Sequence, residues 1–107
     1  MQERIETIDG KGDLYRGRSL YMRVRYHLEE WQEILAGGVR GIKDLGGQLR
    51  SVDKPGDPAP FWDAFDKSEL LTLHLGDGRL WDCYLSTSTG EAMTAGRGLR
   101  GADEAAD

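Results

Sequence analysis

Arginine and aromatic side chains gather between residues 15 and 27 and offer the clearest chemistry in the sequence. Arg23, Arg25 and His27 stand at every second position, so on a β-strand they would share one face at intervals of about 7 Å. Guanidinium groups at that spacing match phosphate or carboxylate oxygens, and tyrosine rings could stack on a base. We therefore predict a ligand-binding face that comprises Tyr15, Arg16, Arg18, Tyr21, Arg23, Arg25 and His27.

The same charges also fit a second interpretation, in which they keep a strand face solvated or pair with Asp and Glu on a neighbouring strand. The net charge of -5 disfavours nucleic acid and anionic membrane as partners, because both are bound chiefly through neutralised phosphates. If the face binds a ligand, we expect a small anion, with a nucleotide or a single strand of nucleic acid as variants of that hypothesis.

Three aromatic residues follow the proline-rich segment KPGDPAP, namely Phe61, Trp62 and Phe65. They favour either a plug that seals one end of the core or an interaction surface for a protein partner or a second copy. Our first hypothesis is accordingly a non-enzymatic binding or protein-interaction module. Such a module could be a homo-oligomer that assembles through these aromatics or through an exposed strand edge.

Catalysis, metals and cofactors are weakly indicated. A hydrolase-like site would need His74 with Asp82, or His27 with Glu29, and nothing in the pattern adds a nucleophile. His27, Glu29 and Glu30 do not close a metal site, because a strand points Glu30 away from the other two. GRGLRG at 96–101 matches G-x-G-x-x-G without a following helix or strand. We predict no catalytic residue, no metal and no cofactor.

The strand that must position the arginines has the strongest periodicity in the chain. Leu20, Met22, Val24, Tyr26 and Leu28 alternate with polar residues, which predicts a buried face opposite the arginine face. For residues 29–36 the pattern fits either a strand or a short helix, and we favour the strand.

A hairpin is predicted over LLTLHLGDGRLWDCYLS, residues 70–86. A three-residue Gly-Asp-Gly loop pairs Leu73 with Trp81 and Leu71 with Cys83, which places all four on one apolar face. The two-residue alternative would put Asp82 among the leucines, so the apolar pattern selects the longer loop. Cys83 is then a buried and inert thiol.

Glycine and proline mark the expected breaks. DGKG at 9–12 predicts a turn that ends an opening strand, and Gly46-Gly47 predicts a break between short strands at 39–43 and 48–52. The prolines form a loop before a short helix around residues 61–65. Residues 96–107 contain few large apolar side chains, and we expect a disordered acidic tail there.

The expected architecture is one mainly β domain over residues 1–95, a small β-barrel or roll of about five to seven strands with one or two short helices. A single cysteine cannot close an intrachain disulfide, and no apolar run is long enough to span a membrane, so we expect a cytoplasmic location.

PilZ-type β-barrels, which bind cyclic dinucleotides, resemble this chain in size and in carrying arginines ahead of a barrel strand. That family has two arginines four positions apart, a spacing that Arg16, Arg18 and Arg23 do not match. Its later Asp/Asn-x-Ser-x-x-Gly motif meets Leu85 and Thr87 here at its first two defined positions. We assign the sequence to no family.

Overall fold

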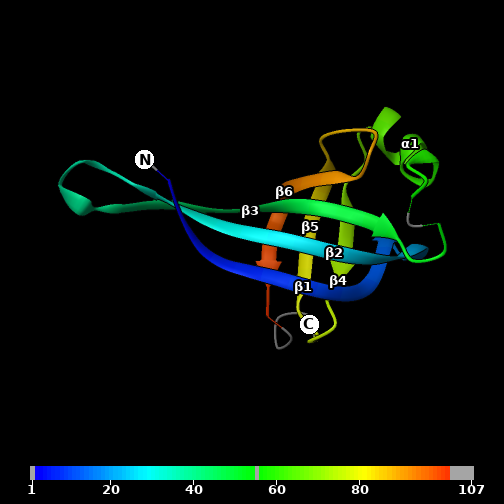
Figure 1. Ribbon diagram of the computed structural model, residues 1–107, viewed down its shortest axis with the longest axis horizontal. Coiled ribbons are helices and arrows are strands. Elements are labelled where there is room, and N and C mark those ends of the chain that lie inside the picture. The colour runs from blue at the N-terminus through cyan, green and yellow to red at the C-terminus, as the bar shows by residue number, and fades with distance from the viewer. Residues whose placement is uncertain (1, 55, 102–107) are drawn as a thin grey trace.

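A computed structural model describes residues 2–54 and 56–101 and shows six strands closed into an antiparallel barrel (Figure 1). Around the barrel the strands follow the order β1-β2-β3-β6-β5-β4. Their bounds are β1 Gln2–Arg16, β2 Ser19–Ile34, β3 Arg40–Ser51, β4 Leu71–His74, β5 Leu80–Leu85 and β6 Glu91–Arg100. This confirms the prediction of a small, mainly β barrel.

The core lies inside the barrel, where rows of alternating apolar residues from the strands meet. Leu14, Val24, Leu28, Leu49, Leu71, Leu73, Trp81 and Cys83 are fully buried. The predicted hairpin register is confirmed, because Leu73 pairs with Trp81 and Leu71 pairs with Cys83. Gly78 adopts the left-handed φ of 94° that its position in the loop requires.

The first three strands are much longer than the barrel needs, and they extend beyond it. We call this projection the arm; it consists of residues 2–7, 29–34 and 40–44 and ends in residues 35–39, which include a single 3-10 turn, Ala36–Gly38 (Figure 1, left). Strand pairing that continues to Ile34 confirms the strand interpretation of most of residues 29–36.

Two glycine-containing breaks predicted from the sequence are wrong. β1 runs through the segment DGKG, and β3 runs through Gly46-Gly47 without interruption. These glycines allow close approach of backbones: a Cβ atom on Gly12 would lie 2.1 Å from the His74 carbonyl oxygen, and one on Gly47 would lie 2.0 Å from that of His27. Glycine therefore occurs at these two positions because a neighbouring backbone leaves no room for a side chain, and the chain does not turn there.

A β-bulge changes the side of the sheet on which two residues lie. The β1–β2 register shifts between Leu14↔Met22 and Tyr15↔Leu20, which leaves Tyr21 as the extra residue. Leu20, predicted to be buried, is 58% exposed, whereas Tyr21 packs against the core. The alternation that holds from Met22 to Leu28 ends at this bulge.

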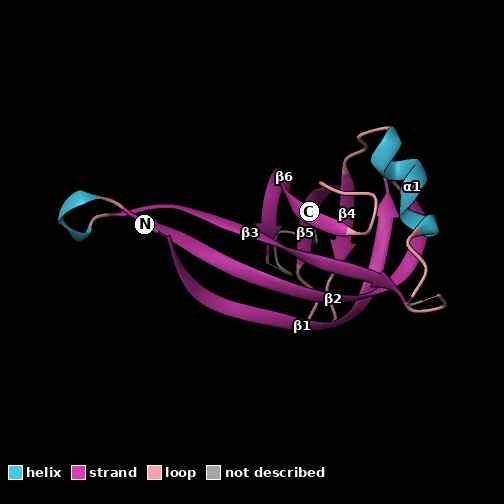
Figure 2. Cartoon of the chain, turned by 45° about the horizontal axis from the view of Figure 1, so that its top comes forward, coloured by secondary structure: helices cyan, strands magenta, loops and turns pink. Residues whose placement is uncertain are grey.

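Helix α1, Ala59–Asp66, covers the end of the barrel that lies opposite the arm (Figure 2). Phe61 is buried in the core, Phe65 packs against it, and Trp62 is half exposed. The burial of Phe61 fits the plug interpretation of this residue. No helix among the described residues combines the length and apolar character needed to cross a membrane.

Part of the segment that we expected to be a disordered tail, residues 96–107, belongs to a strand. Residues 96–100 belong to β6, where Leu99 pairs with Trp81 and Arg100 pairs with Leu80. Arg100 also donates to the buried carboxylate of Asp82 at 2.6 Å, which explains why β6 continues past the predicted domain boundary. Residues 102–107 lie outside the described part of the chain.

Candidate anion-binding site

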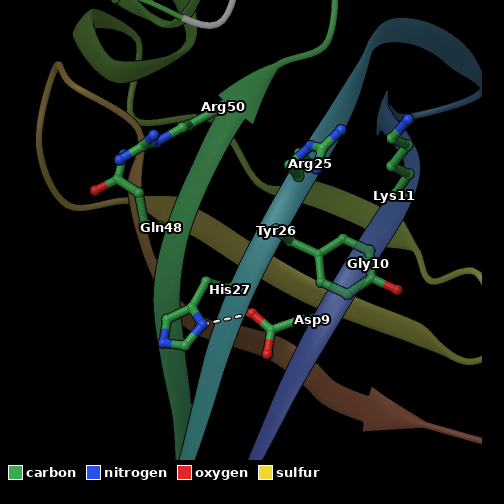
Figure 3. Close-up of a pocket in the computed structure, with 8 residues that line it drawn as sticks. All are labelled: Asp9, Gly10, Lys11, Arg25, Tyr26, His27, Gln48 and Arg50. Carbon is green, nitrogen blue, oxygen red and sulfur yellow. Dashed lines mark hydrogen bonds and ion pairs between the residues drawn. The ribbon is translucent and has the colours of Figure 1, made fainter.

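Three cationic side chains form a row across the outer face of the longest strands. Lys11 on β1 lies directly opposite Arg25 on β2, and Arg25 lies opposite Arg50 on β3. All three are exposed and line a hollow of about 580 Å³ (Figure 3). We call these three residues the cation row. Because neighbouring strands lie about 4.8 Å apart, the row spans roughly 10 Å.

The cation row has no anionic partner within residues 2–54 and 56–101: none of its three side chains forms an ion pair or hydrogen bond there. Like charges directly opposite one another on neighbouring strands destabilise a sheet. Two such contacts occur in succession here, between Lys11 and Arg25 and between Arg25 and Arg50. An anion placed over the row would relieve both repulsions.

Other arginines on the same sheet do have partners. Arg23 lies on the same face of β2 as Arg25, and its Nε is 3.4 Å from the Asp13 carboxylate. Arg4, at the far end of β1, lies 3.5 Å from a Glu29 oxygen. Among the described residues, the cation row therefore differs from these other arginines on the same face, because its side chains have no carboxylate partner.

The next row across the same strands consists of Asp9, His27 and Gln48, which also line the hollow. His27 Nδ1 lies 2.5 Å from an Asp9 oxygen, and its Nε2 lies 3.6 Å from Glu29. The Asp9 carboxylate, through this hydrogen bond and its charge, raises the pKa of His27 above the ordinary value. Gln48 Nε2 donates to the Thr89 carbonyl at 2.8 Å, which orients the Gln48 side chain.

The structure divides the predicted ligand-binding face into separate groups. Of the seven residues predicted for this face, only Arg25, which is part of the cation row, and His27 line the hollow. Arg23 lines a neighbouring hollow with His74, whose ring packs on Tyr15 at a centroid distance of 4.3 Å. Arg18 lies exposed in the β1–β2 turn.

Arg16 and Tyr21 attach helix α1 to the barrel. Arg16 donates to both oxygens of Glu69 at 2.5 Å, and its Nη1 lies 3.0 Å from Asp63. Its guanidinium also lies over the Tyr21 ring at 5.0 Å, while the Tyr21 hydroxyl donates to the Pro60 carbonyl. These contacts give Arg16 and Tyr21 a structural role.

Sequence reasoning missed Lys11, Arg50, Asp9 and Gln48. The sequence predicts a turn at Lys11 and a short separate strand at Arg50, and neither prediction places these residues beside Arg25. Gln48 and Arg50 do flank the buried Leu49, a period-two signal that places both on the outer face. The alignment of three strands in one row depends on their register, which the sequence does not display.

Of the two pairs in the hydrolase-like alternative, His27 and Glu29 lie close together, with His27 Nε2 3.6 Å from a Glu29 oxygen, whereas His74 and Asp82 lie in different surroundings. His74 is exposed and packs on Tyr15, whereas Asp82 is buried and accepts hydrogen bonds from Arg100 and Thr72. Within residues 2–54 and 56–101, no three His, Cys, Asp or Glu side chains are grouped so that they could hold a metal ion. Burial raises the pKa of Cys83 to about 12, which disfavours its thiolate.

Comparisons of the chain with protein-family models, with curated proteins and with solved structures found no match.

Proposed function

We propose that this protein is a non-enzymatic binding module that takes a small polyanion into the hollow over the cation row. The observation that supports this most strongly is the set of three cations on three adjacent strands with no carboxylate partner in the described part of the chain. Phosphate and carboxylate groups suit such a site, because charge-assisted hydrogen bonds to guanidinium and ammonium groups are among the strongest in proteins.

The charge of the site favours a ligand with more than one anionic group. A single phosphate has difficulty contacting three side chains that are spread over roughly 10 Å. Figure 3 shows Lys11 and Arg25 extending on one side of the hollow, and Arg50 lying beside Gln48 on the other. Two anionic groups joined by a short linkage, as in a diphosphate or triphosphate, would reach both sides.

Aromatic side chains give less support to a nucleobase. Tyr26 is the aromatic residue among those that line the hollow, and it is only 5% exposed. Its hydroxyl accepts a hydrogen bond from the Gly76 N–H at 3.0 Å. Tyr15 and Tyr21, the other candidates for stacking, contact His74 and Arg16. The ligand we propose is therefore an inorganic or aliphatic polyanion.

Calorimetric titration with inorganic triphosphate in low salt tests the proposal. We expect saturable binding that weakens about tenfold in Arg25→Gln and in Arg50→Gln, since each substitution removes a charge-assisted contact. Arg79→Gln is the matched control, because it removes the same charge from a side chain that is paired with Asp77. Equal loss in all three variants, or no binding by the native protein, would contradict the proposal.

Self-association through the arm is a second candidate. β1 pairs with β4 only over residues 13–15, so in the described chain residues 2–12 have no strand on their second side. Exposed edges of this length offer unpaired N–H and C=O groups to another strand. Light scattering at high protein concentration is expected to show a mass of twice the chain, and a strict monomer would contradict this candidate.

A further inference from the structure

We propose that His27 is a switchable fourth cation of the site, so that the polyanion binds more tightly when His27 is protonated. This inference rests on the proposed function, because it concerns the regulation of the same hollow. It adds that protonation of His27 changes the charge of the residues that line the hollow.

The geometry places His27 at the side of the cation row. It lies two residues beyond Arg25 on the outer face of β2, and its ring projects into the hollow together with Asp9 (Figure 3). The side chains of His27 and Asp9 are 54% and 64% exposed, respectively, so both are accessible to solvent and to dissolved ions. A charge at either position is therefore felt by an anion bound at the row.

Each element around His27 contributes a group that faces it. Asp9 approaches from β1, Arg25 and Glu29 flank it on β2, and the uncharged amide of Gln48 lies on β3. Glu91 on β6 lines a second hollow together with His27 and Glu29. Two carboxylates, those of Asp9 at 2.5 Å and Glu29 at 3.6 Å, thus lie close to the His27 ring nitrogens, which favours the imidazolium form.

The charge of the lining then changes by one unit across the titration. With neutral His27, Lys11, Arg25 and Arg50 contribute +3 and Asp9 contributes -1, which gives +2 for the residues that line the hollow. Protonation of His27 cancels the Asp9 charge and restores +3. By linkage, an anion that prefers the protonated form also makes His27 harder to deprotonate.

A fluorescent probe whose own charge is constant separates this effect from ligand titration. Pyrene-1,3,6,8-tetrasulfonate has no group that titrates between pH 6 and 9. In low salt we expect it to bind about five- to tenfold more tightly at pH 6 than at pH 9, as expected for one added charge near a multivalent anion.

Two histidine variants test whether His27 causes the pH dependence of probe binding. His27→Gln should bind the probe nearly equally at both pH values, because it leaves the Asp9 charge uncompensated throughout. His74→Gln is the matched control: it removes the other histidine, which packs on Tyr15 outside the hollow, and should keep the full dependence. Far-UV circular dichroism of both variants checks that the barrel is intact.

Proton NMR of the His27 ring gives an independent measurement. The pKa of His27 should lie above the ordinary 6.5 in the free protein and rise further when the probe is saturating. Binding that is independent of pH, or equally dependent in His27→Gln, would overturn this inference and leave the anion site standing. Failure of the probe to bind at any pH would instead contradict the proposed function, and this inference with it.

Discussion

Gly47 has no Cβ atom, and the backbone of β2 occupies the space where that atom would lie. An added Cβ would be 2.0 Å from the His27 carbonyl oxygen and 2.8 Å from Leu28 Cα. We expect Gly47→Ala to lower the free energy of unfolding by about 2–4 kcal/mol, because the strands that carry the cation row must separate to admit it.

Gly56→Ala provides the control for this prediction, since nothing lies within 4 Å of a Cβ atom at that position. Urea denaturation of both variants measures the difference. Equal stability of Gly47→Ala and the native protein would contradict the close approach of β2 and β3 described here.

At the level of single residues, the sequence predicted which side chains are buried better than it predicted which residues lie opposite one another on adjacent strands. Period-two alternation placed Leu71, Leu73, Trp81 and Cys83 correctly, because the hairpin loop and the apolar pattern agree on one register. Lys11 and Arg50 could not be placed beside Arg25 in this way. Their row depends on two further registers, and the segments around them contain glycines that resemble turns.

At the level of elements, helix α1 depends on Arg16, which joins it to β1. Arg16 lowers the pKa of Glu69, and Lys67 together with Arg16 lowers the pKa of Asp63. A lowered carboxyl pKa contributes stability that is present above the unfolded-state value near 4 and is lost as the pH falls through the folded-state value. We therefore expect acid to loosen this contact.

Thermal unfolding from pH 7 to pH 3 tests the role of Arg16. At neutral pH, Arg16→Gln should melt at a lower temperature than the native protein, and the gap should narrow in acid as the two carboxylates become protonated. Arg18→Gln is a suitable control, because Arg18 is exposed in the adjacent turn. A gap that stays constant across this pH range would show that these carboxylates do not contribute.

The arm should be the least protected part of the sheet. Ile5, Leu35 and Val39 are 42%, 46% and 59% exposed, whereas Val24 and Leu28 in the same sheet are fully buried. Amides with few buried neighbours exchange through local opening. In hydrogen-exchange mass spectrometry, residues 29–34 should exchange well before residues 23–28, and equal protection would indicate that the arm is covered in solution.

Strand lengths explain why the sequence predicted the barrel without predicting the arm. The apolar rows that must close on one another are visible in the sequence, and a barrel follows from them. Beyond the barrel, β2 continues as a strand of the arm through Glu30, Gln32 and Ile34. The mixture of polar and apolar residues at 29–36 fits both a helix and a strand, and pairing with β1 and β3 decides for the strand.

At the level of the whole molecule, a net charge of -5 coexists with a local row of three cations. The excess negative charge resides in residues 51–107, whereas residues 1–50 contain nine Lys and Arg against eight Asp and Glu. The cation row lies on the strands of this first half. An electrostatic site of this kind should bind anions less tightly as salt rises, because exposed charges are screened over about 10 Å at 0.1 M salt.

The location of anion binding is the most direct test of the cation row. In ¹⁵N-labelled protein titrated with triphosphate at low salt, amide shifts should concentrate at residues 9–11, 25–27 and 48–50, which line the hollow. The shifts should return toward their free values on addition of salt. Shifts centred on Arg16, Arg18 and Arg23, or no localised shifts at all, would contradict the account.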